Sequence, residues 1–217
     1  LLGDNILATD FSFTIHVRLG AGTYLCGEEI VLLNTLEGNF PLPRSRPPYP
    51  STRGFENHPT VINNVETFAA APKIVALGAP WYHGLGRGKN AGTKVVSVSG
   101  DIARPGNYEI PLGLPLRELL FEWAGGPLEG ASLQAVAMAG ASGGFLGEGG
   151  FGAKLTTARS IKGSQLGAGG IVVFDTSRDM VQVAREQLRF FENEMCGKCE
   201  PCEDGLEQLG AAFDFKD

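Results

Sequence analysis

Three cysteines near the end of the chain have the spacing of metal ligands. In the stretch MCGKCEPCEDG (195–205), Cys196, Cys199 and Cys202 are each separated by two residues. Thiolates bind the irons of iron–sulfur clusters, and this spacing lets one loop hold three corners of a cubane. The intervening glycine and proline suit a tightly turned loop. The spacing therefore predicts an iron–sulfur site with these three cysteines as metal ligands.

Two alternatives to an iron–sulfur cluster stay open. Zinc is usually held by two Cys or His pairs, and the three histidines, His16, His58 and His83, lie far upstream. A buried and inert group of cysteines would need no metal. A cubane also needs a fourth ligand, and Cys26, the one other cysteine, lies between a glycine turn and two glutamates. We expect the fourth ligand beyond Asp217, and not at Cys26.

A second group of residues has the types and order of a nucleotide site. The alternating run FSFTIHVRL (11–19) predicts a strand with one buried face, and a helix is predicted over 28–37. Glycines between a strand and a helix can present free backbone amides to a phosphate. Glu28 and Glu29 can accept hydrogen bonds from a ribose or an amide, or can simply complement the helix dipole. The glycines of this turn are Gly20, Gly22 and Gly27.

The next two segments add polar and aromatic candidates. Residues 39–60 form a proline-rich loop in which no regular element is expected. Tyr49 in this loop could stack on a flat ring or pack on its own prolines. Asn63 or Asn64 can cap a helix over 65–71, which a proline then bends or restarts. Each of these residues therefore has an ordinary structural role beside a possible role in binding.

The second half of the chain predicts a separate module followed by one clear helix. Residues 93–175 combine two strands around the turn ARPGN, a helix in LPLRELLFEW, and strands in LQAVAMAG and GGIVVFD. The glycine-rich stretch 139–152 is expected to be a loop. A helix within 179–197 has apolar residues at steps of three and four. The cysteines therefore begin where this helix stops.

Composition limits the classes of function. The 217 residues are 43% hydrophobic and 19% charged, with a formal net charge of −6. This leaves material for a core and disfavours a nucleic-acid surface. No apolar stretch approaches the roughly 20 residues that cross a bilayer, and the opening LLGDNILATDFSF lacks the features of a signal peptide. We expect a protein of the cytoplasm, or of the soluble side of a membrane assembly, with no nucleic-acid partner and no direct membrane insertion.

Together, these motifs resemble those of a known family. GAGTYLCGEE, PRSRPPYP, HPTVINNVET, GTKVVSVSG, RPGNYEIPLG and CGKCEPC occur here in the order found in the NADH-binding flavoprotein subunit of respiratory complex I. Diaphorase subunits of NAD-linked hydrogenases and formate dehydrogenases are similar. The resemblance covers nearly the whole chain and rests on several independent motifs.

The resemblance implies a fold that combines α/β and α+β parts. Residues 1–82 would be the C-terminal part of an α/β domain that binds FMN and NADH. Residues 93–175 would be a ubiquitin-like β-grasp (SLBB) module, and 178–217 the start of a helical [4Fe–4S] domain. The implied activity is that of an NADH dehydrogenase, which passes electrons from NADH through FMN to the cluster. The implied partners are NADH, a small thioredoxin-like iron–sulfur subunit and a larger iron–sulfur subunit of a multisubunit oxidoreductase.

The resemblance also gives roles to individual positions. Gly27, Glu28 and Glu29 would line the flavin and nicotinamide, and Tyr49 would flank the adenine of NADH near the basic Arg46. No residue is expected to act as a catalytic nucleophile or base. With the glycine turn included, the candidate cofactor-binding residues are Gly20, Gly22, Gly27, Glu28, Glu29, Arg46, Tyr49, Ile62, Asn63, Asn64 and Thr67. The candidate metal ligands remain Cys196, Cys199 and Cys202.

The chain also departs from the pattern of the family. The glycine-rich flavin motif of the family is absent from residues 1–217. EGNFP (37–41) stands where the family has basic residues, and Glu203 stands where the family usually has arginine. We therefore expect a C-terminal portion truncated at both ends, or a degenerate copy, that is inactive by itself. The alternative is a scaffold in which the SLBB module mediates interactions and no flavin is bound.

Overall fold

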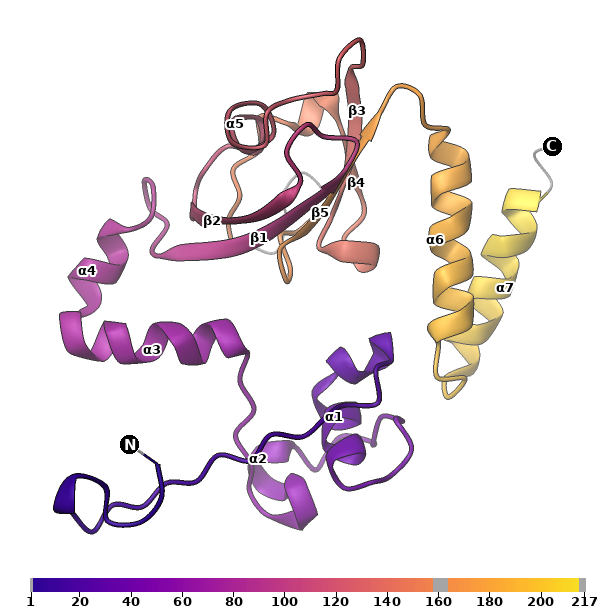
Figure 1. Cartoon of the computed structure of the whole chain (residues 1–217). Helices are drawn as coiled ribbons and strands as arrows, with labels where there is room; N and C mark the ends of the chain where they lie inside the picture. The colour runs from indigo at the N-terminus through magenta and orange to yellow at the C-terminus, as the bar shows by residue number, and fades with distance from the viewer. Residues whose placement is uncertain (1, 158–163, 215–217) are drawn as a thin grey trace. The chain divides into compact units, whose positions relative to one another are not determined.

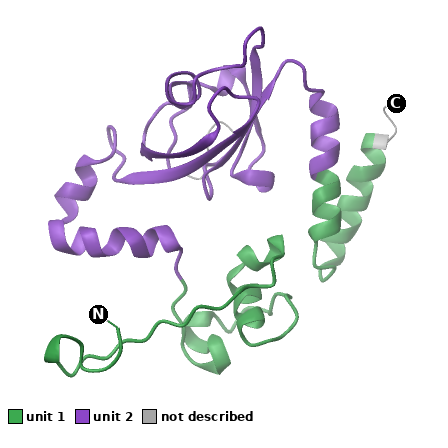
Figure 2. Cartoon of the chain, viewed as in Figure 1, with its two compact units in different colours: residues 1–62, 188–217 green, residues 63–187 purple. Residues whose placement is uncertain are grey.

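The computed structural model describes residues 2–157 and 164–214 and divides into two compact units (Figure 2). The first unit comprises residues 1–62 with 188–217, and the second comprises residues 63–187. The first contains η1 (Ile6–Ala8), η2 (Tyr24–Gly27), α1 (Glu29–Leu36), α2 (Pro50–Arg53), η3 (Phe55–Asn57) and α7 (Glu200–Asp214). The second contains α3 (Val65–Leu77), α4 (Ala79–Gly84), β1 (Thr93–Gly100), β2 (Gly106–Pro111), α5 (Leu116–Glu118), η4 (Leu119–Trp123), β3 (Leu133–Met138), η5 (Gly140–Ser142), β4 (Phe145–Gly147), η6 (Glu148–Gly150) and β5 (Gly170–Asp175). The helix α6 (Met180–Glu194) contributes residues to both units.

A mixed sheet of five strands forms the centre of the second unit (Figure 1). The strand order is β2-β1-β5-β3-β4. β1 and β5 are parallel neighbours, with Val98 opposite Ile171, and the other pairs are antiparallel. The last strand thus lies between two strands that precede it in the sequence. This topology confirms the β-grasp fold predicted for the module.

The core of the β-grasp module lies between the sheet and the helix that follows β2. Alternate strand residues face it, as the two-residue repeat of a strand requires. Val96 and Val98 of β1, and Val173 of β5, are at most 2% exposed. The fully buried Leu119 and Leu120 come from η4. All residues of this cluster lie between positions 96 and 173, so the module has a hydrophobic core of its own.

The helix predicted after β2 is present but changes type along its length. α5 has α-helical geometry, whereas η4 is a π-helical turn that is closed by Ala124 N donating to Leu119 O at 2.8 Å. Pro115 precedes the first helical residue, where its missing amide hydrogen costs nothing. The apolar spacing alone does not distinguish this turn from an ordinary α-helix.

The glycine-rich stretch 139–152 is ordered, and its prediction as a loop is wrong in part. β4 lies within it and pairs with β3 through Leu146, which is buried. Phe151 at its end is fully buried, and its carbonyl accepts from Arg117 N at 2.7 Å. The glycines permit the tight turns on either side, and the large apolar residues hold the stretch to the core.

The N-terminal run 11–19 is not a paired strand with a buried face, contrary to the prediction. Its side chains are exposed, Leu19 completely. Within the described residues, the only bridge to this run joins Phe13 to Gly3. An alternating pattern buries one face only where another strand or an apolar surface covers it. The alternating pattern therefore indicates that the run could pair as a strand. Within the described residues it forms only the bridge between Phe13 and Gly3.

The predictions of two helices and one irregular loop in the first half of the chain have mixed outcomes. α1 matches the helix predicted over 28–37, and α3 begins after Asn64, which caps it as predicted. The proline-rich loop was expected to contain no regular element, but it includes the single turn of α2. Pro50 is the first residue of that turn, a helical position that suits proline.

The predicted helix before the cysteines is α6, and a further helix follows them. Asp179 caps α6 by accepting from Val181 N at 2.8 Å. The preceding Arg178 donates to both carboxylate oxygens of Asp101, and these hydrogen bonds lower the pKa of Asp101. α7 was not predicted. Its Gly210 approaches Glu192 of α6 so closely that a β-carbon there would lie 2.7 Å from the carboxylate.

Candidate cofactor and metal site

Glu28 ends the glycine turn and caps the helix that follows. Its Oε2 accepts from Ile30 N and Val31 N, both at 2.9 Å. These amides have no partner inside a helix, so the carboxylate satisfies two of the unpaired donors at the start of α1. Ile30 and Val31 are themselves buried, which fixes the orientation of the cap. Glu28 therefore has the structural role that the sequence left open beside ligand binding.

Arg46 gathers both glutamates of the CGEE motif. Its Nη2 lies 2.8 Å from Glu29 Oε1 and also donates to Glu28. The three side chains are 36–41% exposed, so each ion pair is screened by solvent and contributes little to stability. Charged groups that are held together but remain accessible can exchange this pairing for a polar ligand. The structure thus brings three of the candidate site residues, from two separate segments, to one place.

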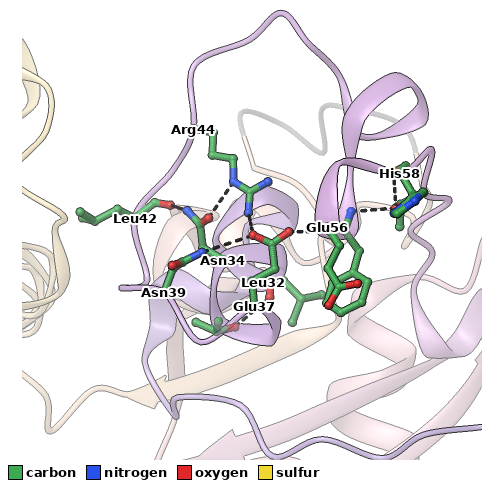
Figure 3. A network of polar contacts seen from close by, with 11 residues as sticks. Leu32, Asn34, Glu37, Asn39, Leu42, Arg44, Glu56 and His58 are labelled. Carbon is green, nitrogen blue, oxygen red and sulfur yellow. Dashed lines mark hydrogen bonds and ion pairs between the residues drawn. The ribbon is translucent and has the colours of Figure 1, made fainter.

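A polar network fixes the loop that carries Arg46 (Figure 3). The Glu37 carboxylate accepts from Arg44 and, at 2.8 Å, from Glu56 N. Arg44 Nε donates to Asn34 Oδ1 at 2.7 Å. The network ties the proline-rich loop to the end of α1 at two points, Arg44, which is two residues before Arg46, and Glu56, farther along the loop. Glu37 belongs to the EGNFP sequence that departs from the family pattern, and its carboxylate serves this network.

The glycine turn and Tyr49 have open surroundings that suit a ligand. A β-carbon added at Gly20, Gly22 or Gly27 would meet no atom within 4 Å among the described residues. Gly22 has a φ of +75°, a backbone conformation that favours glycine. Close packing within the described chain does not account for glycine at any of the three positions. The Tyr49 side chain is 55% exposed, and its ring stacks on no aromatic ring in the described part of the chain.

The remaining candidates for FMN contact follow the proline-rich loop. Ile62 is half-buried and ends the first part of unit 1. Asn63, Asn64 and Thr67 belong to the second unit and are exposed. Asn64 Oδ1 accepts from Glu66 N at 2.8 Å as the cap of α3. Of these four residues, Asn64 has a clear structural role as the cap of α3.

The three candidate cluster ligands lie where α6 ends and α7 begins, with Cys196 and Cys199 between the two helices and Cys202 in the first turn of α7. Residues 194–202, from the last residue of α6 to Cys202, form the cysteine connection. Cys196 is half-buried, whereas Cys199 and Cys202 are exposed, and none forms a disulfide. Gly197 takes a φ of +64°, and Cys202 N donates to Cys199 O at 2.8 Å in the first turn of α7. Three free thiols on one short connection are the right donor set for an iron–sulfur cluster. Among the residues that the structure describes, however, no three potential ligands are arranged around a common metal position.

The cysteine connection and the glycine turn are in contact within the first unit. Tyr24 N, at the start of η2, donates to Glu194 Oε2 at 3.2 Å. Lys198 Nζ donates to the carbonyl oxygen of Pro43 in the proline-rich loop. Cys26 is half-buried in η2, with its sulfur 3.2 Å from Thr23 Oγ1.

Three family models match successive parts of the chain. Residues 4–73 match the Nuo51 FMN-binding domain, residues 95–146 the SLBB domain, and residues 182–214 the NADH-ubiquinone oxidoreductase-F iron–sulfur binding region. The first match contains the glycine turn and Arg46, and the third contains all three clustered cysteines.

Similar whole proteins align with this chain across all three parts. The second F subunit of NADH-quinone oxidoreductase in Rhizobium meliloti is 44% identical over 95% of this chain and 49% of its own length. The corresponding F subunit in Escherichia coli K12 is 42% identical over 95% of this chain and 46% of its own length. The HndC subunit of the NADP-reducing hydrogenase in Solidesulfovibrio fructosivorans is 41% identical over 99% of this chain and 44% of its own length. The chain is similar to these three subunits over nearly its whole length.

A solved structure supports the same relationship. A chain of an NAD⁺-reducing [NiFe]-hydrogenase, in the air-oxidised state, superposes with a TM-score of 0.82 at 40% identity, over 93% of this chain and 34% of that one. The resemblance to flavoprotein and diaphorase subunits drawn from the motifs is thus confirmed. The chain spans about half the length of the curated relatives that it matches. None of the helices in the described ranges has the length and apolar character needed to cross a bilayer.

The capping role of Glu28 can be tested by substitution. We expect Glu28→Ala to lower the local stability of α1 by about 1–2 kcal/mol, because two amides lose their acceptor. Glu28→Gln keeps an acceptor oxygen and should lose less than half of that amount. Hydrogen exchange of the Ile30 and Val31 amides measures the effect. Equal protection in the wild type and Glu28→Ala would contradict the capping role.

Sequence reasoning missed the groups that connect these segments. Glu37, Glu194 and Lys198 each bond to a residue far away in the sequence, and no local pattern marks such partners. The signal available in the sequence was that two charged residues, Glu194 and Lys198, each lie two residues from Cys196. Charged residues beside a thiolate ligand warrant a search for partners.

Proposed function

We propose that this chain is part of the electron-input subunit of an NADH:acceptor oxidoreductase. Residues 1–82 would contribute the C-terminal part of an FMN- and NADH-binding domain, 93–175 the SLBB module, and 178–217 the start of a [4Fe–4S] domain. The observation that carries the proposal is the contact, within one compact unit, between Tyr24 of the glycine turn that leads into CGEE and Glu194 of the cysteine connection. Homology to the F subunits of NADH-quinone oxidoreductases supports the same assignment.

The proposed chemistry needs the chain to position groups and requires no reacting side chain. NADH delivers two electrons as a hydride, a flavin can pass them on singly, and a [4Fe–4S] cluster accepts one at a time. Glu28, Glu29 and Arg46 would orient the nucleotide, and the glycine turn would let it approach the backbone closely. Tyr49 would offer its exposed ring to the adenine.

The remaining assignments follow from the same homology. Ile62, Asn63, Asn64 and Thr67 would contact FMN, and the three clustered cysteines would be three of the four cluster ligands. We propose that the partners are other subunits, among them a small thioredoxin-like iron–sulfur subunit and a larger iron–sulfur subunit. The complex would work in the cytoplasm or at the periphery of a membrane assembly.

The proposal is tested on the intact protein, purified without oxygen. We expect the absorption bands of a bound flavin, which bleach when NADH is added. Arg46→Ala should weaken NADH binding about tenfold, or ~1.4 kcal/mol, because a cation leaves the nucleotide site. Arg53→Ala is the matched control, since the Arg53 side chain forms no ion pair in the described part of the chain. A protein that holds no flavin, or whose flavin NADH does not bleach, would contradict the proposal.

One observation favours a second function. The β-grasp module alone contains the large hydrophobic cluster of the described chain, so it is the part best suited to act as a stable scaffold. In that case the SLBB module would mediate subunit contacts, and residues 1–217 would bind no cofactor. A colourless intact protein that still assembles with partner subunits would favour this scaffold role.

A further inference from the structure

The cysteine connection is bonded to a different loop on each side of Cys196. Two residues before it, Glu194 accepts from Tyr24 N at 3.2 Å, a contact that spans 170 positions of sequence. Two residues after it, Lys198 donates to the carbonyl of Pro43, across 155 positions. Neither contact is a hydrogen bond within one helix or between strands. They are specific tertiary links between the cysteine connection and the two loops that carry the candidate nucleotide residues.

Aromatic contacts reinforce the link at Tyr24. Its ring packs edge-on against Phe190, with ring centres 5.1 Å apart, and against Phe191 at 6.3 Å. The two phenylalanines also contact each other at 5.6 Å. Edge-on aromatic pairs stabilise a contact beyond the burial of their surface. η2 is therefore held to the end of α6 by aromatic contacts as well as by the hydrogen bond from Tyr24 N to the Glu194 carboxylate.

A third polar contact joins the two loops to each other, so that the three contacts form a closed ring of linked chain segments. The ring consists of three short chain segments, 24–28, 43–46 and 194–198. Glu28 at the end of the first segment is paired with Arg46 at the end of the second. Each segment spans no more than five residues and is joined to the other two. A displacement of one segment therefore changes at least one of these contacts.

We propose that Glu194 and Lys198 are positioning residues that couple occupancy of the nucleotide site to the reduction potential of the cluster. The proposal rests on the proposed function, since it needs a cluster on Cys196 and a nucleotide beside Arg46. A nucleotide that binds Arg46 changes the pairing of Arg46 with Glu28. This change alters the contacts among the three segments of the ring. The Lys198 ammonium and the Glu194 carboxylate, two residues from a cluster ligand, then shift relative to the cluster. Nearby charge and hydrogen bonding to the sulfurs set the potential of such clusters.

The size of the coupling follows from linkage. Coupling free energies between two sites usually correspond to changes of about 5–150-fold in affinity. We expect the low end here, about fivefold to tenfold, because the contacts are few and partly exposed. For a one-electron couple, at 59 mV per factor of ten, this is a shift of about 40–60 mV. By reciprocity, the nucleotide must bind the oxidised and reduced protein with affinities that differ by the same factor.

The experiment is a redox titration of the intact protein, followed by the EPR signal of the reduced cluster. The probe is ADP-ribose, a nucleotide without a nicotinamide to oxidise or reduce. We expect saturating ADP-ribose to shift the midpoint potential in the wild type by the stated amount. Glu194→Ala should reduce the coupling to less than about 1.5-fold, or ~10 mV, whereas Glu194→Gln keeps an acceptor for Tyr24 N and should retain most of it. Glu207→Ala, an exposed carboxylate of α7, controls for the removal of a charge.

The possible results distinguish a failure of the coupling from a failure of the proposed function on which it rests. Lys198→Met tests the second link independently, should Glu194→Ala fail to assemble a cluster. A wild type without a cluster signal, or without ADP-ribose binding, would overturn the proposed function. A wild type that has both but shows no shift would overturn the coupling alone. So would an unchanged shift in Glu194→Ala and Lys198→Met.

Discussion

Cys199→Ser should remove the cluster from the intact protein while leaving the bound flavin in place. A hydroxyl is a poor replacement for a thiolate as a ligand to iron, and Cys199 is the middle ligand of the three. We expect the iron content to fall by about four atoms per flavin. The EPR signal of the reduced cluster should disappear with it. Because Cys199 is exposed, the substitution buries no new polar group and should leave the fold intact.

Cys26→Ser is the matched control for the loss of a thiol. Cys26 is the one other cysteine, and it lies in η2 beside Thr23, where a serine can keep the side-chain hydrogen bond. This variant should retain the full iron content. Loss of the cluster in Cys26→Ser would identify that cysteine as the fourth ligand and contradict its exclusion. Retention of the cluster in Cys199→Ser would contradict the ligand set.

Phe151→Ala should be the most damaging change to the fold. Phe151 is fully buried at the end of the glycine-rich stretch, and its carbonyl accepts from Arg117 N. Truncation of a buried phenylalanine costs about 3–5 kcal/mol through lost burial and the cavity that remains. Hydrogen exchange of the β1, β3 and β5 amides in the intact protein should report this loss as a lower free energy of opening.

Phe145→Ala is the control for Phe151→Ala, because it lies in the same glycine-rich stretch. Its ring is 36% exposed and lies on the edge strand, with its centre 6.1 Å from that of Phe174. We expect it to cost about 1 kcal/mol. Equal effects of the two substitutions would mean that the stretch is not anchored by Phe151.

Local patterns predicted the elements whose partners are close in the sequence. The β1–β2 hairpin follows directly from two alternating runs around a proline–glycine turn, and α6 from its apolar spacing. α7 was missed because Pro201 and two glycines lower its helix propensity. In the structure Pro201 lies in the first turn, where proline is tolerated, and Gly210 lets Glu192 of α6 approach.

The candidate site was predictable in its residue types and not in its connections. The CGEE turn and the cysteine spacing were visible because each set is contiguous in sequence. The Glu28–Arg46 pair, and the links from Glu194 and Lys198, join segments separated by long stretches of chain. Such contacts depend on tertiary packing, which a single sequence does not encode in any local pattern. The ligand geometry of the cysteines likewise depends on the metal as well as on the chain.

The most direct test of the account is a stepwise addition of NADH to the oxidised intact protein without oxygen, followed by EPR. If the chain is part of an electron-input module, NADH should bleach the flavin and also produce the signal of a reduced [4Fe–4S] cluster. Cys199→Ser should bleach its flavin and give no such signal. A wild-type protein in which NADH never reduces a cluster, although iron and flavin are both present, would contradict the account.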